Sequence, residues 1–308
     1  GSATMRRRPH RSTRAASSGA MLLAVLLLLA GPGRVTAQQL HGVFIGINDY
    51  VEYADETGDL RGAEHDALLM REVMQERWGL EPMNTLTLLS RDATKRAIRE
   101  SVIDWLASRA EPGDLAVFYF AGHGAQAFDL DGNEPDGLDE TLAPADVLPL
   151  SSENDIRDDE LRNWLSTLRT DVVVILDSCH SGTATRGGEM RARALDRSLP
   201  AEDGTEPSRV RQRPDSESMT DGGSVVELAA AAPNQSALEG PFGEGGLVEQ
   251  RGAFTWILAR ELRSAPPGTT YAQVIEEVAR ELRDREFPQE PRVTGPEGAM
   301  LFTPRGGG

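Results

Sequence analysis

The sequence predicts an α/β fold in which helices pack on a mostly parallel sheet. From His41 onward, short apolar runs alternate with longer amphipathic stretches, which is the pattern of strands and covering helices. Several of the short runs are unbroken, as expected for strands that are buried on both faces. The 308 residues are 39% hydrophobic and 26% charged, which is enough apolar material for a sizeable core and excludes disorder throughout.

The elements follow from these patterns in chain order. The predicted strands are the short apolar runs at residues 43–47, 86–89, 115–120, 172–176, 225–231 and near 300–302. The predicted helices carry an apolar stripe at three-to-four spacing, at residues 62–78, 94–109, 158–168, 253–263 and 271–285. Residues 129–155 are rich in Asp, Gly and Pro, and residues 183–223 in Arg, Ser, Gly and Pro. We expect both to be long surface loops.

Charge and cysteine content exclude several classes of protein. Acidic residues outnumber basic ones 49 to 32, for a formal charge of -17, so sequence-independent binding to a phosphate backbone is disfavoured. We therefore expect no nucleic-acid partner. The single cysteine, Cys179, excludes an intramolecular disulfide and any zinc site that needs two or more thiolates.

The N-terminal residues have the order of an export signal. Residues 1–4 precede the first methionine and are interpreted as left from cloning, and residues 5–37 as a signal peptide. Arginines follow Met5, then an apolar run at 20–30, then small residues up to Ala37. The run is shorter than the roughly 20 residues that span a bilayer. We expect a periplasmic or secreted protein with no stable membrane insertion once the leader is removed; the alternative is an uncleaved N-terminal membrane anchor.

Two predicted strands end in residues that carry chemistry. The strand at 115–120 is followed by His123 between two glycines, and the strand at 172–176 by Cys179. In open parallel sheets, reactive groups gather beyond the carboxyl ends of the strands, and a thiol beside a basic imidazole becomes a strong nucleophile. We predict a cysteine–histidine dyad. One alternative is a small buried hydrophobic cysteine. The other is zinc held by His123, Cys179 and His180, which is disfavoured because adjacent strand residues point to opposite faces.

These residues and their neighbours resemble the metacaspases, in the prokaryotic form of that family. The matching motifs are VFIGIN at 43–48, LRGAEHD at 60–66, YFAGHG at 119–124, DGLDETLAP at 136–144, IRDDE at 156–160, DSCHSG at 177–182, the run at 225–239 and GAFT at 252–255. The resemblance covers nearly all of residues 41–303.

The resemblance implies a caspase-like fold with a central six-stranded sheet and helices on both faces. Residues 38–182 would form a large-subunit-like region, 183–223 an Arg-rich processing loop and 224–308 a small-subunit-like region of the same domain. It also implies a cysteine endopeptidase that acts on proteins or peptides through a thioester, with no cofactor needed for bond cleavage. We expect the chain to be a monomer. Cys179 would be the nucleophile and His123 the general base and acid, with the amides of Cys179 and Gly124 as oxyanion donors.

The resemblance also suggests a preference for substrates with Arg or Lys at P1, the residue before the cut. Asp66 and Asp177 match the family's acidic pocket residues, and two carboxylates suit a guanidinium. Taken singly, Asp66 could be an exposed helix acid and Asp177 a structural hydrogen-bond acceptor. Ala63 and Ala121 stand where the family more usually has polar pocket residues. The size of the pocket is therefore predicted less well than its charge.

Calcium activation is common among metacaspases. The matching carboxylates are Asp139, Asp158 and Asp159, which are oxygen ligands of the kind calcium needs. Arg186 stands where the family has a fourth acid, and a cation there opposes metal binding. Residues 129–140 partly match an EF-hand loop, yet Glu134 occupies its glycine position, so we interpret that match as coincidence. The alternative for these acids is a solvated acidic loop.

The Arg-rich loop predicts self-cleavage within residues 186–213. Its candidate cut sites are Arg186, Arg191, Arg193, Arg197, Arg209, Arg211 and Arg213. The alternative is a flexible loop that is never cut. Two other functions stay open: a caspase-like protease that prefers Asp or Asn at P1, and a caspase-like binding or scaffold module without turnover.

Overall fold

The structure is a computed structural model. A central sheet forms the core of the part of the chain that it describes. The described residues are 1, 38–53, 58–129, 137–179, 190–195, 223–232, 235–244 and 246–303. Within them the sheet has six strands in the order β12-β9-β7-β3-β1-β2. The predicted signal peptide lies outside the described residues.

The central sheet is mostly parallel, as predicted. Its strands are β1 (Leu40–Gly46), β2 (Thr85–Leu89), β3 (Leu115–Ala121), β7 (Asp171–Asp177), β9 (Val225–Ala229) and β12 (Arg292–Thr294). The first five pair in parallel, and β12 pairs antiparallel with β9 at one edge.

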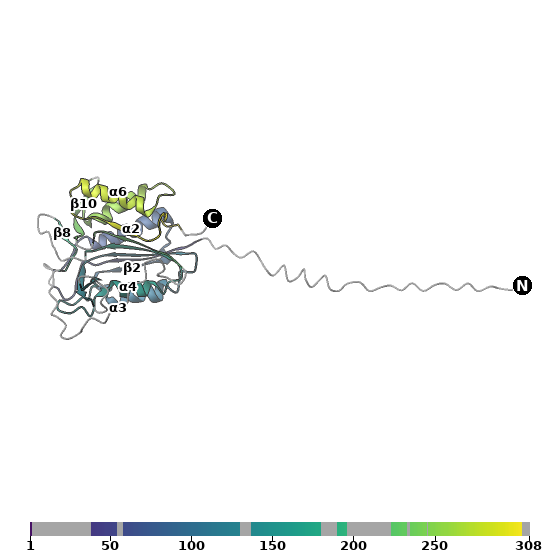
Figure 1. The fold of residues 1–308 in the computed structure, drawn as a ribbon, viewed down its shortest axis with the longest axis horizontal. Coiled ribbons are helices and arrows are strands. Elements are labelled where there is room, and N and C mark those ends of the chain that lie inside the picture. The colour runs from purple at the N-terminus through teal and green to yellow at the C-terminus, as the bar shows by residue number, and fades with distance from the viewer. Residues whose placement is uncertain are drawn as a thin grey trace. The chain divides into compact units, whose positions relative to one another are not determined.

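Helices cover both faces of this sheet (Figure 1). On one face lie α2 (Ala63–Trp78), α5 (Ala253–Ser264) and α6 (Tyr271–Asp284). On the other lie α3 (Lys95–Glu100), its π-helical continuation η3 (Ser101–Leu106) and α4 (Asp158–Leu165). Short 3-10 turns at Pro82–Asn84 and Ser90–Asp92 flank β2. The α/β architecture with two covered faces is therefore confirmed.

Local sequence explains where the helices begin and end. Thr94 accepts a hydrogen bond from the amide of Ala97 and starts α3, and Thr270 forms a capping box with Gln273 at the start of α6. Helix α2 ends at Gly79, whose φ of 67° is a left-handed conformation that glycine adopts without strain.

The core lies on both faces of β1, β3 and β7. All seven residues of β3 are buried, and so are six of the seven in each of β1 and β7. An unbroken apolar run is what a doubly covered strand requires. These three strands therefore form a rigid support for the residues that follow their carboxyl ends.

The prediction of a final strand near residues 300–302 is wrong. The sixth strand is β12; Met300 forms only a single β-bridge, with Thr270, and residues 301–302 form a turn. Leu301 and Phe302 are nonetheless buried, and the Phe302 ring packs 4.5 Å from that of Trp78. The apolar residues of this run therefore belong to a turn that packs on the core. The spacing of apolar residues cannot distinguish such a turn from a short strand.

Both predicted surface loops contain strands. In residues 129–155, β5 (Leu138–Leu142) pairs with β4 (Gly124–Phe128) and with β6 (Ile156–Arg157). In residues 183–223, β8 (Arg191–Ala192) pairs with β10 (Leu238–Glu244), which also pairs with β11 (Leu247–Gly252). The prediction of loop structure throughout these segments is therefore wrong. Within the described ranges, we find no helix with the length and apolar character needed to cross a bilayer.

Candidate active site

His123 and Cys179 follow neighbouring strands of the central sheet. Strands β3 and β7 pair in parallel with Ala121 opposite Asp177. His123 lies two residues beyond the first of these positions and Cys179 two residues beyond the second. Because the two strands are adjacent and in register, both residues come to the same carboxyl edge of the sheet.

Two backbone amides at this edge bind one carbonyl oxygen. The N–H groups of Gly124 and Cys179 donate to the carbonyl oxygen of Arg193, at 2.9 and 3.1 Å. A pair of amides aimed at a single carbonyl can stabilise the negative charge that develops when that carbonyl is attacked. The sequence-predicted oxyanion donors therefore lie around the carbonyl of one residue of the chain itself.

Gly124 allows this close approach. A Cβ atom added to it would lie 1.7 Å from the carbonyl oxygen of Cys179, far inside contact distance. A side chain at this position would push the two amides apart, which gives a physical reason for a glycine directly after His123.

The His123 ring is held in one tautomer. Its Nε2 lies 2.7 Å from the carbonyl oxygen of Gly58, which only accepts, so Nε2 carries the proton. The Tyr50 hydroxyl accepts a hydrogen bond from the His123 amide at 2.6 Å, and the two rings lie 4.9 Å apart. Among the described residues Nδ1 has no hydrogen-bond partner. Burial lowers the pKa of His123 to about 4, so the ring is neutral at pH 7 and Nδ1 is available as a base.

Cys179 is also buried and neutral. Its thiol donates to the carbonyl oxygen of Ala237 at 3.1 Å, and its side chain has no exposed surface. Burial raises the pKa of the Cys179 thiol to about 12. In this arrangement the pair is a thiol and an imidazole rather than a thiolate and an imidazolium.

Arg193 fills a pocket of three carboxylates, which we call the acidic pocket and define by Asp66, Asp177 and Glu239. All three are buried, and the Arg193 side chain is 0% exposed. One terminal nitrogen, Nη1, lies 3.0 Å from Asp177 Oδ2. The other, Nη2, pairs with Asp66 and lies 3.4 Å from Glu239 Oε2. Burial raises the pKa of Asp66 to about 7, opposed by the Arg193 charge.

Helix α5 and the residue before it complete the acidic pocket. The Thr255 hydroxyl donates to Asp177 Oδ2 at 2.6 Å, and the Gly252 amide donates to Asp66 Oδ2 at 2.7 Å. A Cβ on Gly252 would lie 2.2 Å from Asp177 Oδ2 and 2.8 Å from Arg193 Nη1. Gly252 therefore leaves the space that the guanidinium occupies.

Residues 190–195, which we call the inserted segment, cross this edge and include the two-residue strand β8. Arg191 and Ala192 pair with Glu239 and Leu238 of β10. The Arg193 amide donates to Ala237, and the Leu195 amide donates to Gly124, each at 3.0 Å. An added strand that places one side chain in a pocket is a common mode of peptide recognition.

Sequence reasoning included Arg193 only as one of seven arginines in a surface loop. One signal separates it from the others: alanines flank it on both sides, and small neighbours let a chain lie close to a sheet edge. Glu239, Ala237, Gly252 and Thr255 were not singled out as site residues. They lie in the run at 225–239 and in the GAFT motif at 252–255, but strand pairing and helix packing bring them to this edge, and a local motif does not show that.

The three predicted calcium ligands hold arginines instead. Asp139 pairs with Arg157, and both Asp158 and Asp159 pair with Arg162. In the part of the chain that the structure describes, no group of three potential metal ligands comes together. As they stand, these carboxylates do not fit a calcium site, because guanidinium groups already neutralise them.

Several other predicted residues fall outside the described ranges. They are His180, the residues of the EF-hand match at 130–136, and five of the candidate cut sites, Arg186, Arg197, Arg209, Arg211 and Arg213.

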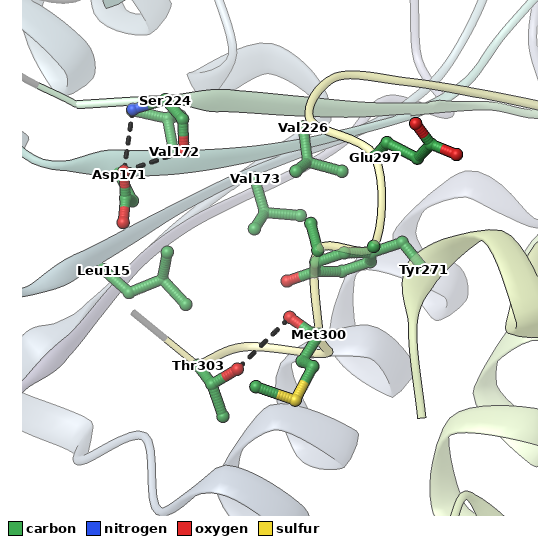
Figure 2. Close-up of a pocket in the computed structure, with 12 residues that line it drawn as sticks. Leu115, Asp171, Val172, Val173, Ser224, Val226, Tyr271, Glu297, Met300 and Thr303 are labelled. Atoms are coloured by element: carbon green, nitrogen blue, oxygen red, sulfur yellow. Dashed lines mark hydrogen bonds between the residues drawn. The ribbon is translucent and has the colours of Figure 1, made fainter. Parts of the chain in front are cut away.

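A separate pocket lies at the opposite end of the sheet (Figure 2). It has a volume of about 260 Å³, and its lining includes Leu115 and Asp171, the first residues of β3 and β7. His123 and Cys179 follow the last residues of the same strands. This pocket is therefore remote from the candidate active site, whose own pocket is filled by Arg193.

Comparison with known proteins agrees with this arrangement. Residues 41–186 match the family described as metacaspase, peptidase C14 domain. A metacaspase-1 of Pyricularia oryzae is 35% identical over 150 residues, which cover 46% of this chain and 36% of the relative. A metacaspase-1B of Aspergillus fumigatus is 27% identical over 292 residues, which cover 82% of this chain and 68% of the relative. In the first of these comparisons, the chain spans about a third of the relative's length.

A solved structure has a similar fold. A protein from Geobacter sulfurreducens superposes with a TM-score of 0.60 at 22% identity, over 86% of this chain and 99% of that protein. The six-stranded sheet and its covering helices define an α/β protein with the fold of this solved structure. Within that fold, residues 41–186 of this chain are similar to the metacaspase peptidase domain.

Proposed function

We propose that this chain is a cysteine endopeptidase that cleaves after basic residues, and that its first substrate is its own Arg193–Ala194 bond. One observation carries the proposal. The carbonyl of Arg193 accepts from the amides of Gly124 and Cys179, while its guanidinium lies among the carboxylates of the acidic pocket. A bound P1 residue needs both contacts at once, and their coincidence supports Arg193 as a P1 residue in cis.

The chemistry follows from the neutral pair. As the Cys179 sulfur attacks the Arg193 carbonyl carbon, Nδ1 of His123 takes the thiol proton. The two amides stabilise the resulting oxyanion. The C–N bond to Ala194 then breaks, and His123 returns the proton to the leaving amine. Water hydrolyses the thioester with His123 again acting as base, which restores the thiol and leaves a carboxylate on Arg193.

The acidic pocket disfavours a P1 preference for Asp or Asn. An acidic P1 side chain would meet three buried carboxylates, and like charges at such distances repel strongly. We therefore propose protein or peptide substrates with a basic P1 residue and no nucleic-acid partner, for a chain that acts as a monomer. A module without turnover would need neither the neutral Nδ1 nor the two converging amides.

Self-cleavage tests the proposal directly. We expect the purified wild-type chain to yield a fragment that begins at Ala194, identified by intact mass, and Cys179→Ala to stay whole. Arg193→Ala should lose this fragment, whereas Arg197→Ala, four residues further along, should keep it. An uncut wild-type chain, or the same cut in Cys179→Ala, would overturn the proposal.

We propose that cleavage needs no bound metal. Calcium binding at Asp139, Asp158 and Asp159 would first have to displace Arg157 and Arg162, which pair with these acids. Excess EGTA should therefore change the rate of self-cleavage by less than about twofold, a difference near the thermal energy. Loss of cleavage in EGTA that added calcium restores would contradict this.

We also propose that residues 5–37 direct export, on the order of their arginines, apolar run and small residues. Cell fractionation of the full chain and of a chain lacking residues 5–37 tests this. The full chain should be found outside the cytoplasm, and the shortened chain within it.

A further inference from the structure

Glu239 faces the guanidinium that fills the acidic pocket. It lies on β10 and is 2% exposed, and its Oε2 is 3.4 Å from Arg193 Nη2. The other two carboxylates come from helix α2 and strand β7. A third segment of the chain therefore contributes charge to the pocket, from a residue that the sequence reasoning did not assign to it.

The three carboxylates divide between the two terminal nitrogens of Arg193. Nη1 faces Asp177, through both its carboxylate at 3.0 Å and its backbone carbonyl at 3.3 Å. Nη2 faces Asp66 and Glu239. A planar guanidinium can occupy both positions at once because its two terminal nitrogens are held apart in a rigid fork.

A lysine ammonium cannot do the same. It is a single charged centre, so it can lie at the Nη1 position or at the Nη2 position. In either place it makes fewer close contacts with the three carboxylates than the two terminal nitrogens of a guanidinium do, and the carboxylate left without a cation is less stable. The division of charge across the pocket thus discriminates between the two basic residues.

We propose that Glu239 is a specificity-determining residue that makes this site select Arg over Lys at P1. The inference rests on the proposed function, in which Arg193 stands for the P1 residue of a substrate. Glu239 supplies the second negative charge at the Nη2 position, which only a guanidinium reaches while it also contacts Asp177.

Glu239 has a structural contact that the test must separate from this role. Its carboxylate accepts from the amides of Arg61 at 2.9 Å and Gly62 at 3.1 Å, just before helix α2, where Gly62 offers no capping side chain. Loss of this contact alone would weaken the α2 end of the pocket for every substrate equally. A change in the ratio between Arg and Lys substrates would not follow from it.

The test uses two peptides that differ only in Arg or Lys at P1. Because Arg193 fills the pocket, the parent protein is the full chain with Arg193→Ala, compared with the same chain carrying Glu239→Gln. Glu249→Gln, which removes an exposed carboxylate on the adjacent strand, is the matched control. In the Cys179→Ala background, the dissociation constants of both peptides provide a second measurement that needs no turnover.

We expect the parent to prefer the Arg peptide by about tenfold or more in kcat/KM, and Glu239→Gln to reduce that preference by about tenfold. Glu249→Gln should leave the preference unchanged. Equal losses for both peptides in Glu239→Gln, or a parent that accepts Lys as well as Arg, would overturn the inference. If neither peptide is cleaved, the proposed function fails, and the dissociation constants still decide the role of Glu239.

Discussion

Burial of the Arg193 guanidinium depends on its charge partners. A buried charge is tolerated when opposite charges and hydrogen bonds replace its hydration, and Asp66, Asp177 and Glu239 provide them. The converse also holds, because three buried carboxylates without a cation would repel one another. The acidic pocket and Arg193 therefore stabilise each other, and the inserted segment lies against the backbone of the buried Cys179.

The reactivity of Cys179 should report whether the inserted segment is in place. Burial raises its pKa to about 12, so at pH 7.5 the thiol is protonated and unreactive. In Arg193→Ala the segment loses its charged anchor, the pKa of the exposed thiol falls towards its ordinary value near 8.5, and the thiolate fraction at pH 7.5 rises. Alkylation by iodoacetamide, followed by mass spectrometry, should be at least about tenfold faster than in the intact wild-type chain. Equal rates would contradict shielding by the segment.

Gly252→Ala should close the acidic pocket without disturbing the backbone. Its φ of −68° suits alanine, yet the new Cβ would lie 2.2 Å from Asp177 Oδ2 and 2.8 Å from Arg193 Nη1. We expect self-cleavage at Arg193 to slow by at least about a hundredfold, a loss of about 2.7 kcal/mol in transition-state binding. Circular dichroism should show an unchanged fold, and normal cleavage by the variant would place the guanidinium elsewhere.

Among single residues, the sequence predicts some members of the site better than others. Asp66 and Asp177 were identifiable because each lies close to a recognisable motif. Glu239 ends the motif at 225–239, but its place in the pocket was not identifiable, because its contact with Gly62, 177 positions earlier, depends on how β10 packs against the start of α2. Contacts of that kind are set by tertiary structure.

Among the elements, the small sheet of β4, β5 and β6 depends on one arginine. Arg157 donates from Nη1 to the carbonyl oxygen of Phe128 at 2.7 Å and also pairs with Asp139. Both side chains are largely buried, with 16% and 8% exposure. The side chain of Arg157, the residue before α4, therefore contacts both the end of β4 and strand β5.

Arg157→Gln should lower the free energy of unfolding by about 1.5–3 kcal/mol, because Asp139 would be left as a buried charge without its partner. Urea denaturation measures this. Arg96→Gln is the matched control, since its pair with Glu100 is exposed and should contribute less than about 0.5 kcal/mol. Losses of equal size in the two variants would show that Arg157 is not such a link.

Element prediction succeeded where periodicity is strong and failed where it is short. The apolar runs of β1, β3 and β7 are long and almost entirely buried, and all three strands were predicted from them. The run at 300–302 is too short to separate a strand from a buried turn. Strands β5 and β8 lie in segments whose Gly, Pro and charge content is typical of loops. Strand β5 is held by pairing with β4 and β6, its neighbours along the chain, and β8 by pairing with β10, which lies far along the chain.

At the scale of the whole molecule, the proposed cut falls between strands that share one sheet. Residues up to Arg193 include β1, β2, β3 and β7, and later residues include β9 and β12. Strands β7 and β9 pair over five residues, and helices α2 and α5 pack together on one face. The two parts therefore share one hydrophobic core.

Cleavage should leave the two fragments associated. We expect them to elute together from a size-exclusion column in native buffer, at the volume of the intact chain, because separation would expose the core face of both. The same sample in 6–8 M urea, a concentration of the order that unfolds small proteins, should give two separate species. Separation in native buffer would show that the sheet does not hold across the cut.

The overall architecture was easier to predict from the sequence than the residue that fills the acidic pocket. Alternation of apolar runs and amphipathic stretches indicates a mostly parallel sheet with two covered faces, and the structure confirms this. The occupation of the acidic pocket by a residue of the same chain was not predictable, because it requires a loop to return to the sheet edge and extend there as a strand.

The two amides that bind the Arg193 carbonyl affect how soon after self-cleavage the site becomes free. After self-cleavage, the new chain end still carries the same guanidinium, and one oxygen of its carboxylate can stay against Gly124 and Cys179. If the chain cuts itself as proposed, its own product would occupy the site, and cleavage of other proteins would begin only when that end leaves. Departure is a first-order event within one molecule, so the delay before activity would be the same in dilute and concentrated solutions.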